Sequence, residues 1–489
     1  MVESARLESV SRASDRRFES CSFRSIFSFC SKFRFEQTLK YNLEMRKLME
    51  NFFKLKELNT NIRTEVIAGL TTFMTMAYII FVNPAMISQT GMDFGASMMA
   101  TCISAAVATL MMGLYANYPI ALAPGMGENA FFTYTVCLTM GISWQVALGC
   151  VFIEGLIFII LTLTKIRQAI IEAIPASLRY GTACGIGILI AFVGLIDAGI
   201  VKGHPSTLVT LGDLLNPATV LAIFGLIITS ILLFKNIKGA MLWGILITAL
   251  VGIPLGIVKY QGLFSLPPSM APTFFKMDIF GALKWGLFSI IFVFLFMDIF
   301  DTVGTLAGVA ELGGFMKQGR LPRAGKAMLS DAVGTCVGAI CGTPTVTSYI
   351  ESAAGIASGG RSGLASVITG LAFLVALFFY PLVKMIGGGY PVSEGVILRP
   401  VTAPALILVG SMMLHSVLKI DWKDYSESIP AFLVMIMMPL TFSIATGIAF
   451  GFISYAALKL FTGKGKEVHW LVYLLAGIFI LRFLYLKAM

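Results

Sequence analysis

The chain of 489 residues is 57% hydrophobic and only 13% charged, with a mean hydropathy of +0.86. An ordinary soluble chain carries about 25% charged residues, so this composition excludes a soluble globular protein and predicts one that spans a lipid bilayer. The formal net charge of +10 does not indicate nucleic-acid binding, because the basic residues concentrate in particular loops, as they do in the cytoplasmic loops of membrane proteins.

Neither the cysteines nor the histidines form a pattern typical of a metal site. The eight cysteines include no C-x-x-C pair, and most lie in hydrophobic segments, where small apolar packing residues are expected. The three histidines, His204, His415 and His469, are far apart, so we expect no metal and no histidine proton relay. The sequence has no H-E-x-x-H or G-x-S-x-G motif and no room for a soluble catalytic domain, which predicts a protein that is not an enzyme, with no catalytic residues and no cofactor.

Residues 1–60 are predicted to form a cytoplasmic tail. Its first part, residues 1–44, is rich in Ser, Arg and Phe, lacks sustained periodicity and has no apolar core of a signal peptide. We expect this part to be disordered, or to result from a start codon placed too early, because Met45 would be a natural start. A basic amphipathic stretch, residues 49–63, leads into the first hydrophobic segment.

Fourteen hydrophobic segments follow, and a helix needs about 20 residues to cross the hydrocarbon core of a bilayer. We predict spans at 65–87, 95–116, 119–140, 143–164, 178–200, 216–234, 238–258, 284–309, 325–342, 343–359, 363–386, 394–418, 429–440 and 443–461. A further hydrophobic helix, at 468–486 within the C-terminal region 462–489, has no assigned place.

The segment 429–461 fits either one long helix or two short spans. Pro439 and the stretch 441–446 favour a break. With a cytoplasmic N-terminus, the loops after even-numbered spans should be basic, and two short spans place the lysines of residues 459–466 in the cytoplasm. The other basic loops fit this orientation; they contain Lys165, Arg167, Arg179, Lys235, Lys238, Lys317, Arg320, Arg323, Lys326 and Arg361.

The third and tenth spans contain runs of Gly and Pro, at 118–129 and 341–345. Two interrupted hydrophobic segments in matching positions of two halves indicate the binding site of an inverted-repeat transporter. Seven spans per half is an odd number, so the halves insert in opposite orientations. In each segment we expect a short extended stretch followed by a half-helix, whose first N–H groups carry a partial positive charge toward a cavity.

Carboxylates also lie where a bilayer does not tolerate them. Asp298 and Asp301 belong to the eighth span and Glu351 to the tenth. An acid in hydrocarbon is costly and is a functional candidate by default. Acids in two separate spans predict one polar site near the midplane, as in a transporter.

Four motifs resemble those of the AzgA-type purine permeases, a group of the nucleobase–cation symporter superfamily that includes the uracil and xanthine permeases. The motifs are Asn61–Tyr78, Ala123–Gly127 with Asn129 and Ala130, Asp298–Gly304, and Thr347–Gly355. The resemblance covers about residues 55–460.

This resemblance implies an all-α polytopic membrane protein of about fourteen transmembrane spans, arranged as two inverted seven-span repeats with short extended stretches in spans 3 and 10. A core domain would combine residues 61–165 and 284–386, and a gate domain residues 166–260 and 394–461. The substrate would lie between the two domains.

The resemblance also implies that Asp301, Glu351, Asn129 and Gly127 bind the substrate. Their chemistry fits a purine, because a carboxylate such as Glu351 can accept two N–H bonds in the plane of the ring. Asn129 offers both a donor and an acceptor, and Gly127 allows the backbone to approach a ligand closely. Helix capping is the structural alternative for Glu351 and Asn129.

Four residues are expected to couple a proton or to support the site: Asp298, Glu128, Thr302 and Thr347. Asp301 could accept a second purine edge or carry the coupling proton. For Asp298, a structural role explains its position equally well. Glu128 stands where many relatives have an apolar residue, which leaves the ranking of substrates open.

Other candidates have simpler explanations. Glu154 and Asp331 are acids of the fourth and ninth spans, and we expect them to belong to a structural network. Phe131 and Phe132 could stack on a purine face, but ordinary packing explains them better in a chain with 38 phenylalanines.

The sequence therefore predicts a multi-pass permease of the plasma (inner) membrane that carries hypoxanthine, guanine or adenine inward by proton symport and alternating access. The sequence does not distinguish which of these purines is preferred, whether sodium takes the place of the proton, or whether the protein forms a homodimer. The alternative is an anion or other-nucleobase transporter on the same fold, and the acids argue against an anion. A channel fits less well, because broken half-helices and paired acids suit an occluded site.

Overall fold

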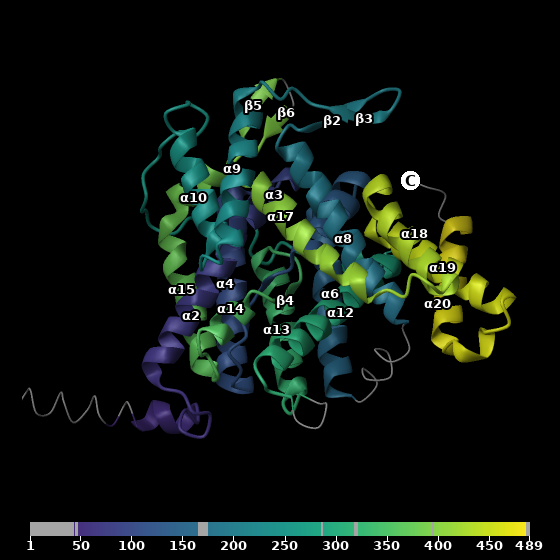
Figure 1. Cartoon of the computed structure of the whole chain (residues 1–489), viewed down its shortest axis with the longest axis horizontal. Coiled ribbons are helices and arrows are strands. Elements are labelled where there is room, and N and C mark those ends of the chain that lie inside the picture. Colours follow the sequence, from purple (N-terminus) through teal and green to yellow (C-terminus); the bar gives the residue numbers. More distant parts are fainter. Residues whose placement is uncertain are drawn as a thin grey trace, which may run out of the picture. The chain divides into compact units, whose positions relative to one another are not determined.

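The computed structural model of the chain describes residues 44, 47–164, 175–284, 287–316, 321–393 and 396–485 (Figure 1). The predictions for residues 1–43, a disordered or wrongly started tail, lie outside these ranges. The chain divides into two units, residues 1–62 and 63–489. In the first unit, residues 47–52 are helical and turns continue to residue 59.

The second unit is built from helices, with three small two-stranded sheets. The elements before residue 260 are α2 (Ile62–Met76), α3 (Ile79–Ile87), η1 (Ser88–Thr90), α4 (Phe94–Met111), η2 (Met112–Ala116), β1 (Leu122–Pro124), α5 (Met126–Ala130), η3 (Phe131–Thr139), α6 (Trp144–Leu163), α8 (Ala176–Asp197), β2 (Val201–His204), β3 (Leu208–Leu211), α9 (Pro217–Phe234) and α10 (Ala240–Gly252).

The later elements are α11 (Ile279–Ala282), α12 (Phe288–Leu312), α13 (Ala324–Cys341), β4 (Val346–Ser348), α14 (Ser352–Ala357), α15 (Gly363–Ala376), η4 (Leu377–Phe379), α16 (Tyr380–Gly387), β5 (Tyr390–Ser393), β6 (Val396–Leu398), α17 (Ala403–Met413), η5 (Leu414–Lys419), α18 (Tyr425–Thr441), α19 (Ile444–Phe461), η6 (Gly465–Glu467) and α20 (Trp470–Tyr485). Eight of the described helical segments are long and apolar enough to cross a membrane by length and composition, and four further apolar helices are shorter.

The helices and the β1 and β4 stretches follow the same order in both halves, as expected for an inverted repeat, whereas the hairpins β2–β3 and β5–β6 come after different helices of their halves. Helix α4 and the extended stretch β1 correspond to α13 and β4. One threonine holds each stretch in the same way. Thr109 of α4 accepts a hydrogen bond from the N–H of Leu122 (2.9 Å) and donates one to its carbonyl (2.8 Å). Thr335 of α13 does the same for Val346, with both bonds at 3.1 Å.

The two extended stretches pair with each other. Strands β1 and β4 are antiparallel, with Leu122 opposite Ser348, Ala123 opposite Thr347 and Pro124 opposite Val346. This pairing satisfies backbone groups that could find no water at this depth in a bilayer. The half-helices α5 and α14 follow their strands closely in the sequence, so the prediction of an extended stretch and a half-helix in spans 3 and 10 is confirmed.

Contacts between loops show which helix ends share one side. Lys238, between α9 and α10, donates to the hydroxyl of Ser358 at the end of α14 (2.8 Å). Asn117, after η2, accepts from the N–H of Gly363 at the start of α15 (2.6 Å). These junctions follow the second, sixth and tenth spans, as the charge pattern predicts for a common side.

Junctions after odd-numbered spans meet in the same way. The N–H of Asp278, before α11, donates to the carbonyl of Gln145 at the start of α6 (2.8 Å). Arg399, after β6, forms an ion pair with Asp197 at the end of α8 (3.3 Å). The contacts on both sides therefore agree with the predicted order of fourteen spans. The hairpins β2–β3 and β5–β6 lie at the same end of the helices (Figure 1).

The segment 429–461 forms two helices, as the lysine positions predicted. Helix α18 continues through Pro439 and ends at Thr441, and the next residue, Phe442, has a positive φ of 47°. Ser443 then caps α19 by accepting from the N–H of Thr446. The break thus comes after the proline, at the residue whose backbone leaves the helical region. Helix α20 packs against α19.

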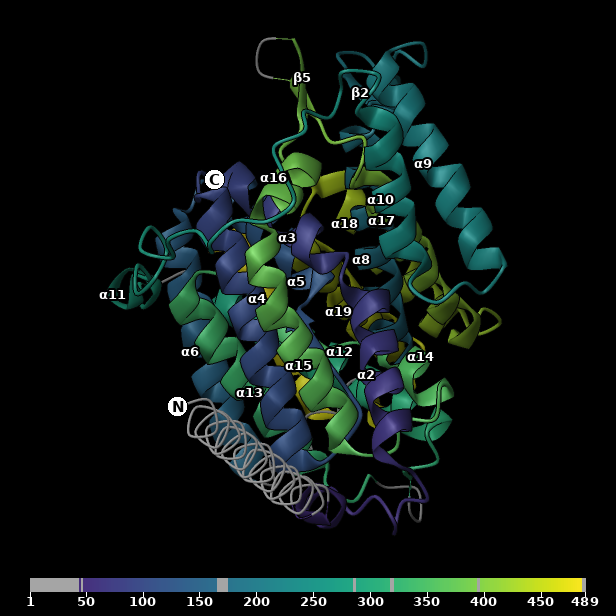
Figure 2. The same ribbon diagram turned by 90° about the vertical axis from the view of Figure 1, so that its left-hand side faces the viewer.

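Two sets of helices pack within this unit. Helix α4 contacts α13 and α15, and α13 also contacts α6, so these helices run alongside one another (Figure 2). Helix α8 contacts α17 and α18. Glycines allow the close approach of α8 and α17, because a Cβ at Gly187 or Gly410 would lie under 3.0 Å from backbone oxygen of the other helix.

Candidate functional site

The paired strands bring the third and tenth spans together at one place. Beyond the strand ends, the N–H of Gly125 donates to the carbonyl of Thr345 (3.0 Å), and the N–H of Tyr349 donates to that of Ala121 (3.0 Å). The hydroxyl of Tyr349 reaches back to the carbonyl of Pro124 (2.6 Å). The predicted site residues of both spans are therefore positioned by one pair of hydrogen-bonded extended stretches.

Glu351 lies just before α14 and is partly exposed. Its side chain makes no capping bond to the helix, so the structural alternative considered for this residue does not describe it. Instead, its Oε1 accepts a hydrogen bond from the hydroxyl of Tyr78 (2.7 Å), between α2 and α3. The carboxylate is held from one side and remains accessible.

Asp301 lies in α12 with its side chain exposed, within hydrogen-bonding reach of the hydroxyl of Thr347 in β4. Open space lies beside Gly304 and Gly308, which follow Asp301 along α12. Asp301 and Glu351 interact electrostatically. The structure thus brings Asp301, Glu351 and Thr347 together.

Asn129, Glu128 and Gly127 lie in the first turn of α5 and are buried. The amide nitrogen of Asn129 contacts the carbonyl of Pro124 (3.5 Å), while its amide oxygen has no hydrogen-bond partner. Glu128 folds back toward Gly125, leaves one oxygen without a partner, and interacts with Asp301. Unpaired buried groups of this kind are costly unless something else bonds to them.

Asp298, one turn before Asp301, and Thr302, the residue directly after it, face the protein interior. Both are fully buried. The hydroxyl of Thr302 donates to Asp331 of α13. The carboxyl of Asp298 lies within hydrogen-bonding reach of Glu154 of α6 and of Asp331. Helix α12 thus carries an acid on its open face and a second acid inside a buried cluster.

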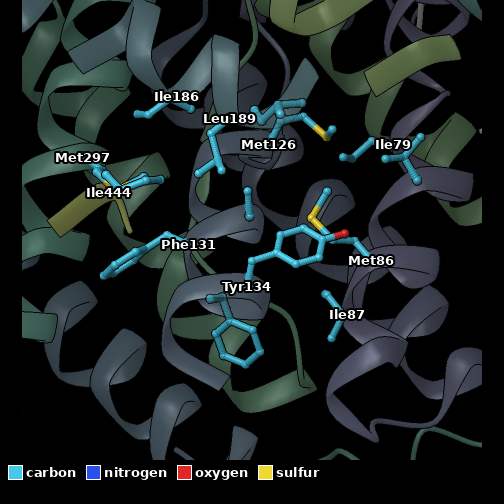
Figure 3. Close-up of a cluster of buried hydrophobic side chains, with 14 of the residues drawn as sticks. Ile79, Met86, Ile87, Met126, Phe131, Tyr134, Ile186, Leu189, Met297 and Ile444 are labelled. Atoms are coloured by element: carbon cyan, nitrogen blue, oxygen red, sulfur yellow. The ribbon is translucent and has the colours of Figure 1, made fainter. Parts of the chain in front are cut away.

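An apolar cluster packs the site helices against their neighbours (Figure 3). It includes Met126 of α5, Ile186 and Leu189 of α8, Met297 of α12 and Ile444 of α19. Gly127 belongs to this contact, because a Cβ at its position would lie 2.8 Å from Cγ2 of Ile186.

Phe131 and Phe132 are fully buried, and Phe131 packs edge-on against Phe294 with ring centroids 4.8 Å apart. Packing therefore accounts for these two rings. Sequence reasoning did not identify Tyr78, whose hydroxyl could have been suspected only because a phenol needs a partner when it is buried. In the part of the chain that the structure describes, no group of His, Cys, Asp and Glu could hold a metal ion.

With this geometry established, comparison with known proteins identifies the family. The family model described as the Permease family matches residues 63–450. The chain belongs to this permease family.

Its relatives include named transporters. It is 58% identical to a candidate permease of Methanocaldococcus jannaschii over 443 residues, which is 90% of this chain and 99% of the relative. It is 47% identical to the guanine/hypoxanthine permease PbuG of Bacillus subtilis, covering 90% of this chain and 100% of that one. It is 42% identical to the adenine permease AdeP of Escherichia coli, covering 90% and 97% of the two chains.

Solved structures confirm the fold. The transmembrane domain of the cyanobacterial bicarbonate transporter BicA matches with a TM-score of 0.58 and 16% identity, over 78% of this permease and 97% of that chain. SLC26A9 matches with a TM-score of 0.58 and 11% identity, over 87% and 70%. The permease is an all-α membrane protein of two inverted seven-span repeats.

Proposed function

We propose that this protein is a purine nucleobase permease that imports hypoxanthine, guanine or adenine across the plasma membrane. Relatives that are 42–47% identical over nearly their whole length are named guanine/hypoxanthine and adenine permeases. The observation that carries the proposal is that Glu351, Asp301 and Asn129 lie close to the paired strands β1 and β4 in the sequence or in space. The two carboxylates can accept N–H groups, and the amide oxygen of Asn129 has no hydrogen-bond partner.

Glu351 would accept two N–H groups of the purine edge, since Tyr78 orients its carboxylate. Asn129 would pair with a second part of the ring through its donor and acceptor. Asp301 would accept an N–H group from a further edge of the purine ring, or would bind a proton. Gly127 would allow the ring to approach the backbone of α5 closely.

The fold alone would also suit an anion carrier, as it does in the bicarbonate transporter BicA. The half-helices favour a negative ligand at their N-termini. In this chain, however, Glu128 lies in the first turn of α5 and Glu351 directly precedes α14, and both interact with Asp301. These acids would repel an anion. A mostly neutral base with N–H donors complements the same groups.

Transport would follow from movement of two domains. The core domain would comprise residues 61–165 and 284–386, and the gate domain residues 166–260 and 394–461. Relative movement would expose the site to each side in turn, driven by a co-transported proton. The N-terminus would lie in the cytoplasm, in accord with the basic loops on its side. A homodimer is the assembly we propose to test.

Uptake of labelled hypoxanthine, guanine and adenine should be measured in cells that lack their own purine carriers, with and without a protonophore. We expect accumulation that the protonophore abolishes. The variant Glu351→Gln, which removes the charged acceptor that Tyr78 holds, should lose most uptake while reaching the membrane normally. Absence of uptake of all three purines by correctly inserted protein would refute the proposal, and normal uptake by E351Q would refute the site.

A further inference from the structure

Three acids meet in the interior of the permease, beside the candidate substrate site. Glu154 of α6, Asp298 of α12 and Asp331 of α13 are each fully buried. We call these three residues the carboxyl triad. The carboxyl of Asp298 lies within hydrogen-bonding reach of both others. Thr302 donates to Asp331, and Thr345 donates to Glu154 (3.4 Å).

The hydroxyl bonds satisfy only part of this cluster. One oxygen of Glu154, one of Asp331 and both oxygens of Asp298 receive no hydrogen bond from a protein donor. Asp298 is thus a fully buried polar side chain that points at two other acids and has no donor of its own. Two ionised carboxylates in contact repel each other, whereas a proton between them supplies the missing donor.

Within the described ranges, no Lys, Arg or His forms an ion pair with an acid of the triad. The titratable groups that face Asp298 are Glu154 from α6, Asp331 from α13 and Glu128 from α5, and Glu154 also interacts with the thiol of Cys336. A buried charge that remains unpaired is strongly disfavoured, and a buried acid without a basic partner becomes neutral by binding a proton.

We propose that the carboxyl triad is the binding site of the proton that this permease co-transports, separate from the purine-binding acids Asp301 and Glu351. The inference rests on the proposed purine transport. A proton is favoured over a metal cation, because the part of the chain covered by the structure contains no set of three or more His, Cys, Asp and Glu side chains that could hold a metal ion. The step is a simple protonation: one carboxylate oxygen gains a proton from one side of the membrane and loses it to the other.

Two elements connect the triad to the substrate site. Asp298 and Asp301 are one turn apart in α12. Thr345 and Thr347 are two residues apart, so they share one face of the extended stretch, where one contacts Glu154 and the other Asp301. A purine that engages Asp301 therefore acts on the two elements that hold the proton site, which would couple the two binding events.

The test uses the full-length protein purified and reconstituted in liposomes. Labelled hypoxanthine, or whichever purine the wild type transports, is followed in two assays. The first measures accumulation under an imposed proton gradient, and the second measures exchange at equal pH. Asp298→Asn imitates the protonated carboxyl. We expect it to exchange purine within about twofold of wild type but to lose gradient-driven accumulation. Glu311→Gln, an exposed acid in the last turn of α12, is the matched control and should retain both.

Accumulation by D298N equal to that of wild type would overturn the proposal. If D298N does not insert or fold, Glu154→Gln is tested with the same expectations. Infrared spectra of the purified wild type give a second measurement, in which a protonated buried carboxyl contributes a C=O stretching band at neutral pH. That band should disappear or shift in D298N or E154Q and persist in E311Q, and a band unchanged by the substitutions would also overturn the proposal. Failure of the wild type to transport any purine would instead refute the proposed function, and the infrared result would still test the triad.

Discussion

The side chain of Tyr78 determines how Glu351 faces the candidate site, because its hydroxyl holds Oε1 at 2.7 Å. Tyr78→Phe keeps the ring and its packing but removes this donor. A hydrogen bond to a charged group contributes about 1.5–3 kcal/mol, part of which water can replace at a partly exposed carboxylate, so the KM for purine should rise roughly fivefold to tenfold. This KM is measured from the kinetics of purine uptake at constant expression. Tyr134→Phe, which loses a bond to Gln89 instead, should leave the KM unchanged; equal effects of the two variants would contradict the role of Tyr78.

Gly127 allows close packing of α5 against α8, in addition to the substrate contact that we propose for it. In Gly127→Ala, the new Cβ would lie 2.8 Å from Cγ2 of Ile186, which is tighter than ordinary contact. Overpacking costs about 1–3 kcal/mol, and here it would push α5 away from α8 and slow transport. Ile186→Ala removes the clashing methyl group, so the double variant G127A/I186A should regain transport that G127A alone loses. Failure of this rescue in a folded double variant would assign the defect to the ligand contact rather than to the helix contact.

Single residues show what sequence can and cannot predict. Asp301 and Glu351 could be proposed as site residues because a carboxylate in an apolar segment is conspicuous by its cost. Tyr78 could not, since a tyrosine in an apolar run resembles a packing residue until its partner, 273 positions away, is known. Glu154 and Asp331 were expected to form a structural network. That they contact Asp298 depends on the packing of three helices, which no local pattern encodes.

At the level of elements, the glycines and prolines of spans 3 and 10 predicted the broken helices but not their antiparallel pairing. That pairing requires Leu122 and Val346 to be fixed by Thr109 and Thr335, one from each repeat. The isosteric variants Thr109→Val and Thr335→Val each leave a buried N–H and a buried carbonyl without this partner.

An unsatisfied buried polar group costs about 1–3 kcal/mol, so either variant should lower the unfolding temperature by several degrees. Fluorescence-detected thermal unfolding in detergent measures this change. Thr229→Val is the matched control, because its hydroxyl bonds only to the carbonyl of Gly225 one turn earlier in its own helix. A T109V or T335V protein as stable as T229V would show that the threonine bonds do not hold the strands.

For the whole molecule, the charge pattern predicted that the junctions after even-numbered spans share one side, and the junctions after the second, sixth and tenth spans are in contact. The relative position of the two predicted domains could not be derived in that way. The hydrogen bond from Lys238 to Ser358 joins residues that we assign to different domains, one to the gate and one to the core. If transport requires these domains to move past each other, this contact must break and reform in each cycle.

A covalent link at that position should therefore stop transport without destroying the site. In the variant Lys238→Cys with Ser358→Cys, a short membrane-permeant bismaleimide would join the two thiols, and we expect purine uptake to fall at least tenfold while purine binding persists. The single variants treated with the same reagent are the controls, and they also account for native cysteines, of which the six described are buried or partly buried. Full uptake by the crosslinked double variant would mean that residues 238 and 358 stay together through the cycle, so that the boundary between the moving parts must lie elsewhere.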